Sequence, residues 1–244
     1  MKENKYDDKR FFEAYSKFSR SVYGLSAAGE WHELKKLFPD FEGKRVLDIG
    51  CGYGWHSNYA AEQGAGYVLG IDISEKMLAV AKEKSTAPSI EYMKMAMEDM
   101  DFEEGAFDIA ISSLALHYTP GFNGICRQVR KALTKGGSFV FSAEHPIFTA
   151  QGLQDWVYDA KGDPDHWPVD RYFEEGRRDT VFIGERVVKY HRTITTYVKT
   201  LLEAGFALTG LVEPMPEPGL LEEDPEMLKE LKRPMMILIS AKKL

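Results

Sequence analysis

The chain has 244 residues, 44% of them hydrophobic, which is enough to bury a sizeable core in one large domain or two small ones. Its formal net charge is -7 and it contains no long run of basic residues, so neither DNA nor an anionic membrane is expected as a standing partner.

Signals for export or membrane insertion are missing from the sequence. No run of about 18 apolar residues occurs, and the opening MKENKYDDKR lacks the apolar centre of a signal peptide. The two cysteines, Cys51 and Cys126, are neither paired in a short motif nor numerous enough for a disulfide framework. These features lead us to expect a cytoplasmic protein.

Residues 1–40 are expected to form a helical N-terminal extension. Apolar and aromatic residues recur at helical spacing from position 7 onward, with Tyr15 and Phe18 on or near one face. A second helical segment, 30–38, ends before Pro39.

From residue 45 onward, short apolar runs alternate with stretches of helical spacing. Helices are expected over 57–63, 75–84 and 121–133. Strands that alternate with helices build a parallel sheet covered on both faces. The pattern therefore predicts an α/β fold, and the predicted strands are RVLDIG, YVLGIDI, IEYMKM, FDIAISSL and GSFVFSAEH.

The alternation is interrupted by a segment of aromatic and charged residues, 146–190. We expect an insertion within a single domain that spans 1–244, ending in two strands joined around Gly184. A helix over 193–204 and two last strands, FALTGLVEP and PMMILISAKK, resume the core pattern. The proline-rich acidic segment between these two strands cannot itself be a strand.

The segment VLDIGCGYG joins the first predicted strand to the next helix through three glycines. Gly50, Gly52 and Gly54 keep this turn free of side chains, so a ligand can contact the main chain at the edge of the sheet where α/β proteins bind ligands. Asp48 lies inside this apolar run, where burial of a charged carboxylate is costly, so packing alone does not explain its presence. Asp72 ends the second strand, where a carboxylate can accept hydrogen bonds from both ribose hydroxyls. The loop therefore predicts an adenosine-type ligand.

Nicotinamide dinucleotides are a competing class of ligand for such a loop. Their fingerprint, G-x-G-x-x-G, requires a third glycine where this chain has Trp55, whose ring would obstruct the close helix–strand packing around a pyrophosphate. A phosphate-binding GxxxxGK loop is also missing from the sequence. A ligand without phosphates fits the loop better.

Four longer segments occur in a fixed order: VLDIGCGYGWHSNYAAEQGA, VLGIDIS, FDIAISSLALHY and LTKGGSFVFSAEHP. Together they resemble the class I S-adenosylmethionine-dependent methyltransferases, particularly the small-molecule group related to the ubiquinone and menaquinone biosynthesis enzymes. The resemblance implies a Rossmann-like three-layer fold whose seven strands lie in the order 3-2-1-4-5-7-6, the last antiparallel. It also implies S-adenosyl-L-methionine as cofactor and in-line methyl transfer to a small-molecule acceptor, with S-adenosyl-L-homocysteine as product.

Individual cofactor contacts also follow from the resemblance. Ala96 stands where relatives usually have an aspartate, so the adenine amino group is expected to meet the backbone of Met97 and the side chain of Glu98. In the alternative interpretation, Glu98 is a solvated loop charge and His117 a hydrogen-bonded core group. The implied cofactor-binding residues are Asp48, Gly50, Cys51, Gly52, Asp72, Ile73, Met77, Met97, Glu98, Ser112 and His117.

Two histidines, His145 and His191, are candidate catalytic bases for an acceptor that must lose a proton, although good orientation makes a base optional. His145 follows the fifth strand at the ligand edge of the sheet, and His191 precedes the late helix, with Arg192 beside it for an acidic substrate. Alternatively, both histidines have structural roles. His145 then pairs with Glu144 or caps a strand, and His191 forms a hydrogen bond with the backbone near the start of the helix.

The N-terminal extension and the insertion are expected to form a lid over the acceptor, although the insertion's aromatic residues could instead make a small core of their own. The aromatic candidates for the acceptor site are Tyr15, Tyr23, Trp31, Trp156, His166, Trp167, Tyr172 and Phe173.

Other functions fit the sequence less well. A nucleic-acid amino methyltransferase would carry a proline-rich tetrapeptide after the fourth strand, where this chain has SSLALHY. No cluster of oxygen ligands for a metal is evident in the sequence. A tRNA methyltransferase and a cofactor-binding protein without turnover remain as alternatives, and a monomer or homodimer is expected.

Overall fold

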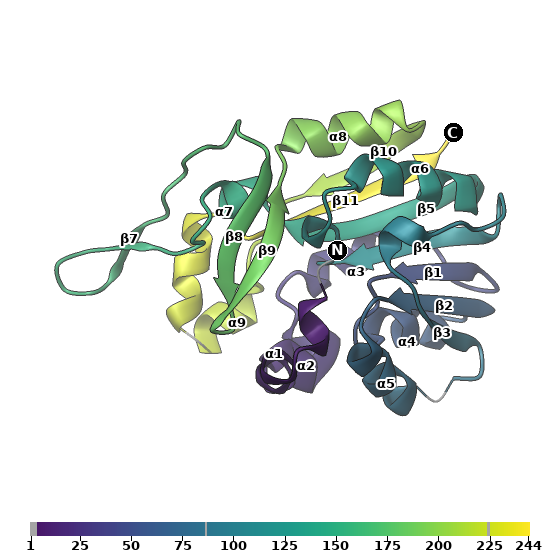
Figure 1. The fold of residues 1–244 in the computed structure, drawn as a ribbon, viewed down its shortest axis with the longest axis horizontal. Helices are drawn as coiled ribbons and strands as arrows, with labels where there is room; N and C mark the ends of the chain where they lie inside the picture. Colours follow the sequence, from purple (N-terminus) through teal and green to yellow (C-terminus); the bar gives the residue numbers. More distant parts are fainter. Residues whose placement is uncertain (1–3, 86, 224) are drawn as a thin grey trace.

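A seven-stranded sheet organises the chain in this computed structural model, which describes residues 4–85, 87–223 and 225–244. The strand order is β10-β11-β5-β4-β1-β2-β3, with helices on both faces (Figure 1). β11 pairs antiparallel with β5 and β10, and the other neighbours pair in parallel. The α/β class and the expected 3-2-1-4-5-7-6 order are therefore confirmed. The sheet strands are β1 (Arg45–Ile49), β2 (Tyr67–Asp72), β3 (Ile90–Lys94), β4 (Phe107–Ser113), β5 (Leu133–Glu144), β10 (Phe206–Val212) and β11 (Met236–Lys243).

The central strands are apolar along their length because both faces of the sheet are covered. Leu47 and Ile49 face one buried cluster together with Tyr197, and Val46 faces a second cluster on the opposite side. Local capping sets the ends of helices. At the start of α5, for example, the Ser74 hydroxyl accepts a hydrogen bond from the backbone N–H of Met77. The helices that cover the sheet are α4 (Trp55–Glu62), α5 (Glu75–Lys84), α6 (Phe122–Ala132) and α8 (Ile194–Glu203).

The N-terminal extension is helical but broken into short pieces. Gly24 is the clearest cause, because its φ is +63° and a Cβ there would lie 2.8 Å from the ring of Trp55. The apolar face expected along the extension is only partly buried, since Phe11 is fully buried whereas Phe18 is 42% exposed. The pieces are η1 (Lys5–Asp7), α1 (Lys9–Tyr15), α2 (Ser19–Tyr23), η2 (Gly24–Ala27) and α3 (Trp31–Leu37).

The segment after β5 forms structure outside the main sheet. β8 and β9 make an antiparallel hairpin that stands beside the sheet, with the turn around Gly184 as expected (Figure 1). Within the described residues, no helix is long and apolar enough to cross a membrane. The elements are α7 (Pro146–Ala150), β6 (Val157–Tyr158), β7 (Pro164–His166), β8 (Gly176–Phe182) and β9 (Glu185–His191), and the later proline-rich segment holds α9 (Pro218–Glu223) and η5 (Pro225–Lys232).

Candidate active site

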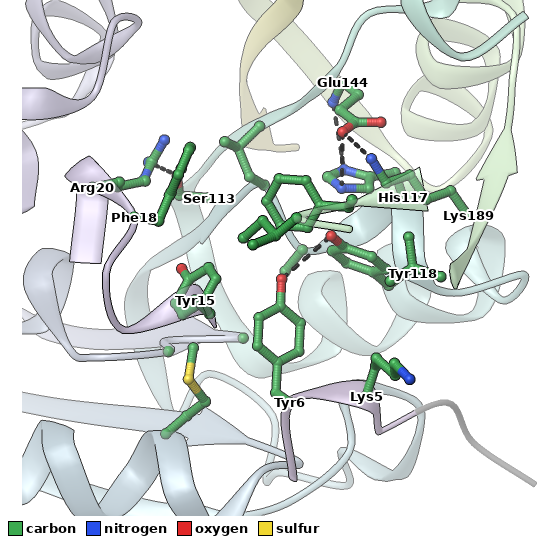
Figure 2. Close-up of a pocket in the computed structure, with 18 of the residues that line it drawn as sticks. Lys5, Tyr6, Tyr15, Phe18, Arg20, Ser113, His117, Tyr118, Glu144 and Lys189 are labelled. Atoms are coloured by element: carbon green, nitrogen blue, oxygen red, sulfur yellow. Dashed lines mark hydrogen bonds and ion pairs between the residues drawn. The ribbon is translucent and has the colours of Figure 1, made fainter. Parts of the chain in front are cut away.

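A cavity of about 620 Å³ lies at the edge of the sheet where β1, β2 and β4 end. Gly50 and Asp72 line it from the strand ends, Tyr15 from the N-terminal extension, and Phe182 from the β8–β9 hairpin. Cavities of this size hold a cofactor or a drug-sized ligand and bury most of its surface. Three segments far apart in the sequence thus enclose one binding space (Figure 2).

The glycine loop forms the floor of this cavity. Gly50 has a φ of +70°, and a Cβ at this position would lie 2.5 Å from the Cβ of Ala115. The loop backbone can adopt this left-handed conformation only because glycine has no side chain. Both Gly50 and Gly52 line the cavity, so main-chain atoms face whatever binds there.

Asp72 is held in place by the loop and by the start of α5. Its Oδ2 accepts a hydrogen bond from the backbone N–H of Gly52 at 2.9 Å, and its Oδ1 accepts one from that of Ser74 at 2.8 Å. Burial raises the pKa of Asp72, although these backbone hydrogen bonds oppose the shift. Each carboxylate oxygen has further lone pairs, so Asp72 can still accept hydrogen bonds from two ligand hydroxyls.

The wall next to Asp72 is mainly apolar. Ile73, Met77 and Met97 line it, together with Glu98. The backbone carbonyl of Glu98 accepts a 3.2 Å hydrogen bond from the side-chain amide of Gln128, which holds this wall in place. Thioether side chains adapt to the shape of a flat ring, so this wall suits an aromatic base.

Three predicted cofactor residues, Asp48, Cys51 and Ser112, lie behind the loop and do not line the cavity. The Asp48 carboxylate accepts a 2.7 Å hydrogen bond from the Ser57 hydroxyl, and burial raises the pKa of Asp48 to about 7. Ser112 donates to the backbone carbonyl of Ile49 at 2.9 Å. Their contacts support the loop from the protein interior.

His145 is fully buried and lies outside the cavity. Its Nδ1 accepts a 3.0 Å hydrogen bond from the backbone N–H of Ile147, which makes His145 the N-cap of α7. Its Nε2 lies 2.8 Å from a carboxylate oxygen of Glu213. Both ring nitrogens therefore have structural partners, and neither faces a cavity-bound substrate.

His191 is also fully buried away from the cavity. Its Nδ1 lies 2.7 Å from the hydroxyl of Thr149, and its Nε2 lies 2.8 Å from the backbone carbonyl of Tyr172. The neighbouring Arg192 donates to the backbone carbonyls of Leu116 and Thr119, so it is not directed at an acidic substrate either. The geometry matches the structural interpretation of both histidines.

A polar cluster lines the cavity from the end of β5, the turn after β4 and β9 (Figure 2). Lys189 donates to Glu144 Oε1 at 2.5 Å and to Gln154 Oε1 at 2.9 Å. His117 lies beside Glu144, and burial lowers the pKa of His117 to about 4. Close by, the hydroxyl of Tyr118 lies 3.3 Å from that of Tyr6.

Known proteins with similar sequences and structures identify the cofactor chemistry. The methyltransferase domain family matches residues 47–141. A solved structure from Listeria monocytogenes, assigned to the S-adenosylmethionine-dependent methyltransferases, is 56% identical, covers 91% of this chain and 99% of its own, and superposes with a TM-score of 0.86. An S-adenosylmethionine-dependent methyltransferase from Mesorhizobium loti is 43% identical, covers 90% of this chain and 100% of its own, and gives a TM-score of 0.84.

The chain belongs to the S-adenosylmethionine-dependent methyltransferase family. The ubiquinone biosynthesis O-methyltransferase of Bordetella avium is a further relative, 36% identical over 46% of this chain and 46% of that enzyme. The chain thus matches about half of that enzyme's length.

S-adenosyl-L-methionine is the cofactor of this methyltransferase family, and the cavity fits it. The glycine floor leaves room for a ligand against the backbone, Asp72 retains free lone pairs, and the adjacent wall is apolar. An adenosyl group without phosphates requires such a combination, whereas a dinucleotide also needs a site for its pyrophosphate.

Several cavity residues of this methyltransferase were missed by sequence reasoning. Arg20 forms a 2.6 Å ion pair with buried Glu30 and donates to the hydroxyl of Ser113 at 3.0 Å. Lys189 lies on the buried side of β9, between Val187 and His191, where alternation favours an apolar residue. A charged residue at such a position is the signal that could have identified Lys189. The main residues missed are Lys5, Tyr6, Arg20, Ser113, Glu144, Gln154, Phe182 and Lys189.

Few of the expected aromatic residues line the cavity. Tyr15 does, whereas Tyr23 is 69% exposed and Phe173 is 90% exposed. Trp156 and Trp167 form a separate cluster with each other, with ring centroids 5.3 Å apart. The insertion contributes Phe182 to the cavity instead.

Proposed function

We propose that this methyltransferase acts on a small molecule bound in the same cavity as the cofactor. The observation that supports this is the enclosure of the cavity beyond Asp72. The N-terminal extension and the hairpin meet there: Lys5 Nζ lies 3.2 Å from Glu185 Oε2, and the rings of Phe18 and Phe182 are 5.9 Å apart. Such a lid covers the space beside the cofactor in which a small acceptor is held.

The cofactor contacts follow from the positions around the glycine loop. We assign the ribose hydroxyls to Asp72 and the adenine ring to Ile73, Met77 and Met97, all of which line the cavity. We assign the cofactor carboxylate to Arg20, which lines the cavity and whose Nη2 reaches Ser113 at the end of β4.

The protein's own contribution is to bind and orient two molecules. When bound, S-adenosylmethionine supplies an electrophilic methyl group on a positively charged sulfur. The lid residues Tyr6, Tyr15 and Phe182 enclose the space in which the acceptor is aligned. Orientation of this kind can supply roughly 7–11 kcal/mol of the barrier.

Nucleic acid is a less suitable acceptor for this cavity. The chain carries a formal net charge of -7, which disfavours binding to a phosphate backbone. Both cysteines are free and buried, which fits a reducing compartment such as the cytoplasm.

Methyl transfer from radiolabelled S-adenosylmethionine tests the proposal. The protein is incubated with the small-molecule, tRNA and protein fractions of a cell extract, and Asp72→Ala serves as the cofactor-binding control. Label is expected in the small-molecule fraction only, and far less of it with the variant. Label confined to tRNA or protein, or no transfer despite tight cofactor binding, would contradict the proposal.

A further inference from the structure

We propose that the methyl acceptor carries an acidic hydroxyl, a phenol or an enol, and that it binds as its oxyanion between Lys189 and His117. This inference rests on the proposed function, because it concerns the acceptor half of the same cavity. The polar cluster leaves hydrogen-bonding groups of Lys189 and His117 available to a ligand.

Lys189 has one hydrogen-bond donor more than its partners among the described residues use. Its ammonium carries three N–H groups, and two of them are directed at Glu144 Oε1 and Gln154 Oε1. The side chain is only 3% exposed, yet Lys189 lines the cavity. The third N–H is therefore available to a ligand inside the cavity and not to bulk water.

Glu144 has no oxygen left without a donor. Its Oε1 accepts from Lys189, and its Oε2 accepts from the side-chain amide of Gln154 at 2.8 Å. Burial favours the neutral acid, but the neighbouring His117 and Lys189 together hold the pKa of Glu144 below its ordinary value. Glu144 is thus an ionised group that holds Lys189 in position.

His117 adds a second donor to the same wall. Its Nδ1 accepts a 3.4 Å hydrogen bond from the backbone N–H of Glu144, so the neutral ring carries its proton on Nε2. Nε2 lies 4.0 Å from Glu144 Oε1, which is too far for a hydrogen bond. Among the described residues the Nε2–H group therefore has no hydrogen-bond acceptor, and it is available to a ligand.

The wall therefore offers donors to the acceptor, one of them charged. An oxyanion presents only lone pairs and suits both donors, whereas an amine in its cationic form would face the Lys189 ammonium. Among the described residues, the other carboxylates that line the cavity are Asp72, at the end of β2, and Glu98, in the turn after β3.

The surroundings of this wall are apolar. Lys189 Nζ lies 5.2 Å from the ring centroid of Phe182, and Val187 and Met235 also line the cavity. Two other cationic side chains of the described residues near this site already have partners. Lys5 pairs with Glu185, and Arg192 donates to a backbone carbonyl. A mostly apolar ring with one acidic hydroxyl matches this environment.

The reaction is balanced without a protein base. The hydroxyl proton leaves to solvent when the acceptor binds as its anion. An electron pair of the anion forms the new bond to the methyl carbon, and the carbon–sulfur bond breaks with its pair left on sulfur. This accounts for a cavity in which His145 and His191 face away from the substrate space.

Absorbance of 4-nitrophenol reports ionisation of a bound hydroxyl directly. The probe is titrated into the protein with S-adenosylhomocysteine present, at a pH below the probe's solution pKa. Wild-type protein is expected to produce the phenolate band. The double variant Lys189→Met/Glu144→Gln, which removes both charges together and keeps the side chains similar in size, should weaken the ionised form at least about tenfold, which is about 1.4 kcal/mol.

The single variant Glu144→Gln separates anion binding from a structural role. It removes the negative charge that pairs with Lys189 and repels an incoming anion. A bound phenolate then becomes the counter-charge of the Lys189 ammonium, so phenolate affinity should rise. Lys199→Met is the matched control, because Lys199 is exposed and pairs with Glu203 at 3.6 Å on α8. Weaker phenolate binding by Glu144→Gln, an unchanged band in the double variant, or no phenolate band with wild-type protein would each overturn the proposal.

Cofactor affinity and methyl transfer, measured in the same proteins, separate this inference from the proposed function. The double variant should bind S-adenosylmethionine with wild-type affinity. Transfer of label only to amines or thiols would overturn the oxyanion proposal while a small-molecule methyltransferase remains. Absence of transfer to every small-molecule fraction would instead contradict the proposed function.

Discussion

The carboxylate of Asp7 accepts a 2.6 Å hydrogen bond from the hydroxyl of Ser74. The same oxygen accepts a 3.1 Å hydrogen bond from the backbone N–H of Lys76 in the first turn of α5. Because α5 follows directly after Asp72, these bonds fasten the N-terminal extension to the cofactor end of the cavity. The neighbouring residue Tyr6 lines the cavity. The Asp7 carboxylate therefore connects the cofactor end of the cavity to the part of the lid that carries Tyr6.

Asp7→Ala is expected to loosen the N-terminal extension. Residues 4–27 should exchange their amide hydrogens faster, and cofactor affinity should fall several-fold, since the lid closes less often. Hydrogen exchange and calorimetry measure the two effects, with the exposed Asp101→Ala as control. Unchanged exchange in 4–27 would contradict the docking role.

The pH dependence of this contact has a defined sign. Hydrogen bonds from Ser74 and Lys76 outweigh burial and lower the pKa of Asp7. A lowered carboxyl pKa contributes stability at neutral pH that is lost as the pH falls through the folded value. Exchange in 4–27 of the wild-type protein should therefore approach that of the variant under acid conditions.

Asp72→Ala should weaken binding of S-adenosylmethionine by roughly 1.5–3 kcal/mol, the range for hydrogen bonds to a charged group. Asp72→Asn should also weaken it, because the amide nitrogen cannot accept one of the two backbone N–H bonds, from Gly52 and Ser74, that the carboxylate oxygens receive. Calorimetry gives both affinities. Equal affinity for wild type and Asp72→Ala would show that the ribose lies elsewhere.

Removal of either buried histidine should reduce stability and leave the chemistry largely intact. His191→Ala loses contacts to Thr149 and to the carbonyl of Tyr172, and His145→Ala loses the N-cap of α7. We expect a loss of about 1–3 kcal/mol in the free energy of unfolding for each, the cost of unpaired buried groups. The pH profile of kcat should keep its shape, and loss of one limb in either variant would support a catalytic base there.

Asp48→Asn should stabilise the protein above neutral pH and have little effect near pH 4. Burial raises the pKa of Asp48 to about 7 in the folded chain, compared with about 3.9 in an unfolded one. The folded state therefore binds the proton more tightly, and stability declines as the pH rises from about 4 to about 7. The gain at high pH should be on the order of 2–4 kcal/mol, measured by urea denaturation at several pH values. A pH-independent difference would contradict this assignment.

Arg233 joins the insertion to the segment that precedes β11. Its guanidinium lies over the rings of Phe148, Trp156 and Trp167, at 4.8, 5.2 and 4.3 Å from their centroids. Arg233→Met should reduce the free energy of unfolding by about 1–3 kcal/mol, since each such contact is worth roughly 0.5–2 kcal/mol. Tryptophan fluorescence during denaturation measures the loss, with the exposed Arg10→Met as control. A variant as stable as the control would show that aromatic packing alone holds the insertion.

The sheet and the cofactor loop could be predicted from the sequence because their signals are local. Buried parallel strands must be continuously apolar, and a backbone that bends at Gly50 and Gly52 requires glycine there. Asp72 was placed correctly at the cavity edge because the end of a strand is visible in the apolar pattern. The same local rules predicted the hairpin around Gly184.

The acceptor half could not be predicted, because long-range packing assembles it. Lys189, Glu144 and His117 come from three separate elements, and no spacing along the chain connects them. Their proximity depends on how the hairpin folds back against the end of β5. Likewise, His145 and His191 follow predicted strands, but the side on which each ring lies is decided by neighbours such as Glu213 and Thr149.

The alternation of apolar strands with helices thus indicated the fold class, and the loop of Gly50 and Gly52 with Asp72 indicated an adenosine-type ligand. The resemblance of the longer motifs to methyltransferases then implied the methyl donor. Tertiary structure decided which polar groups face the cavity. A buried charge such as that of Lys189 is stable only when a partner from elsewhere in the chain reaches it, and Glu144 provides that partner.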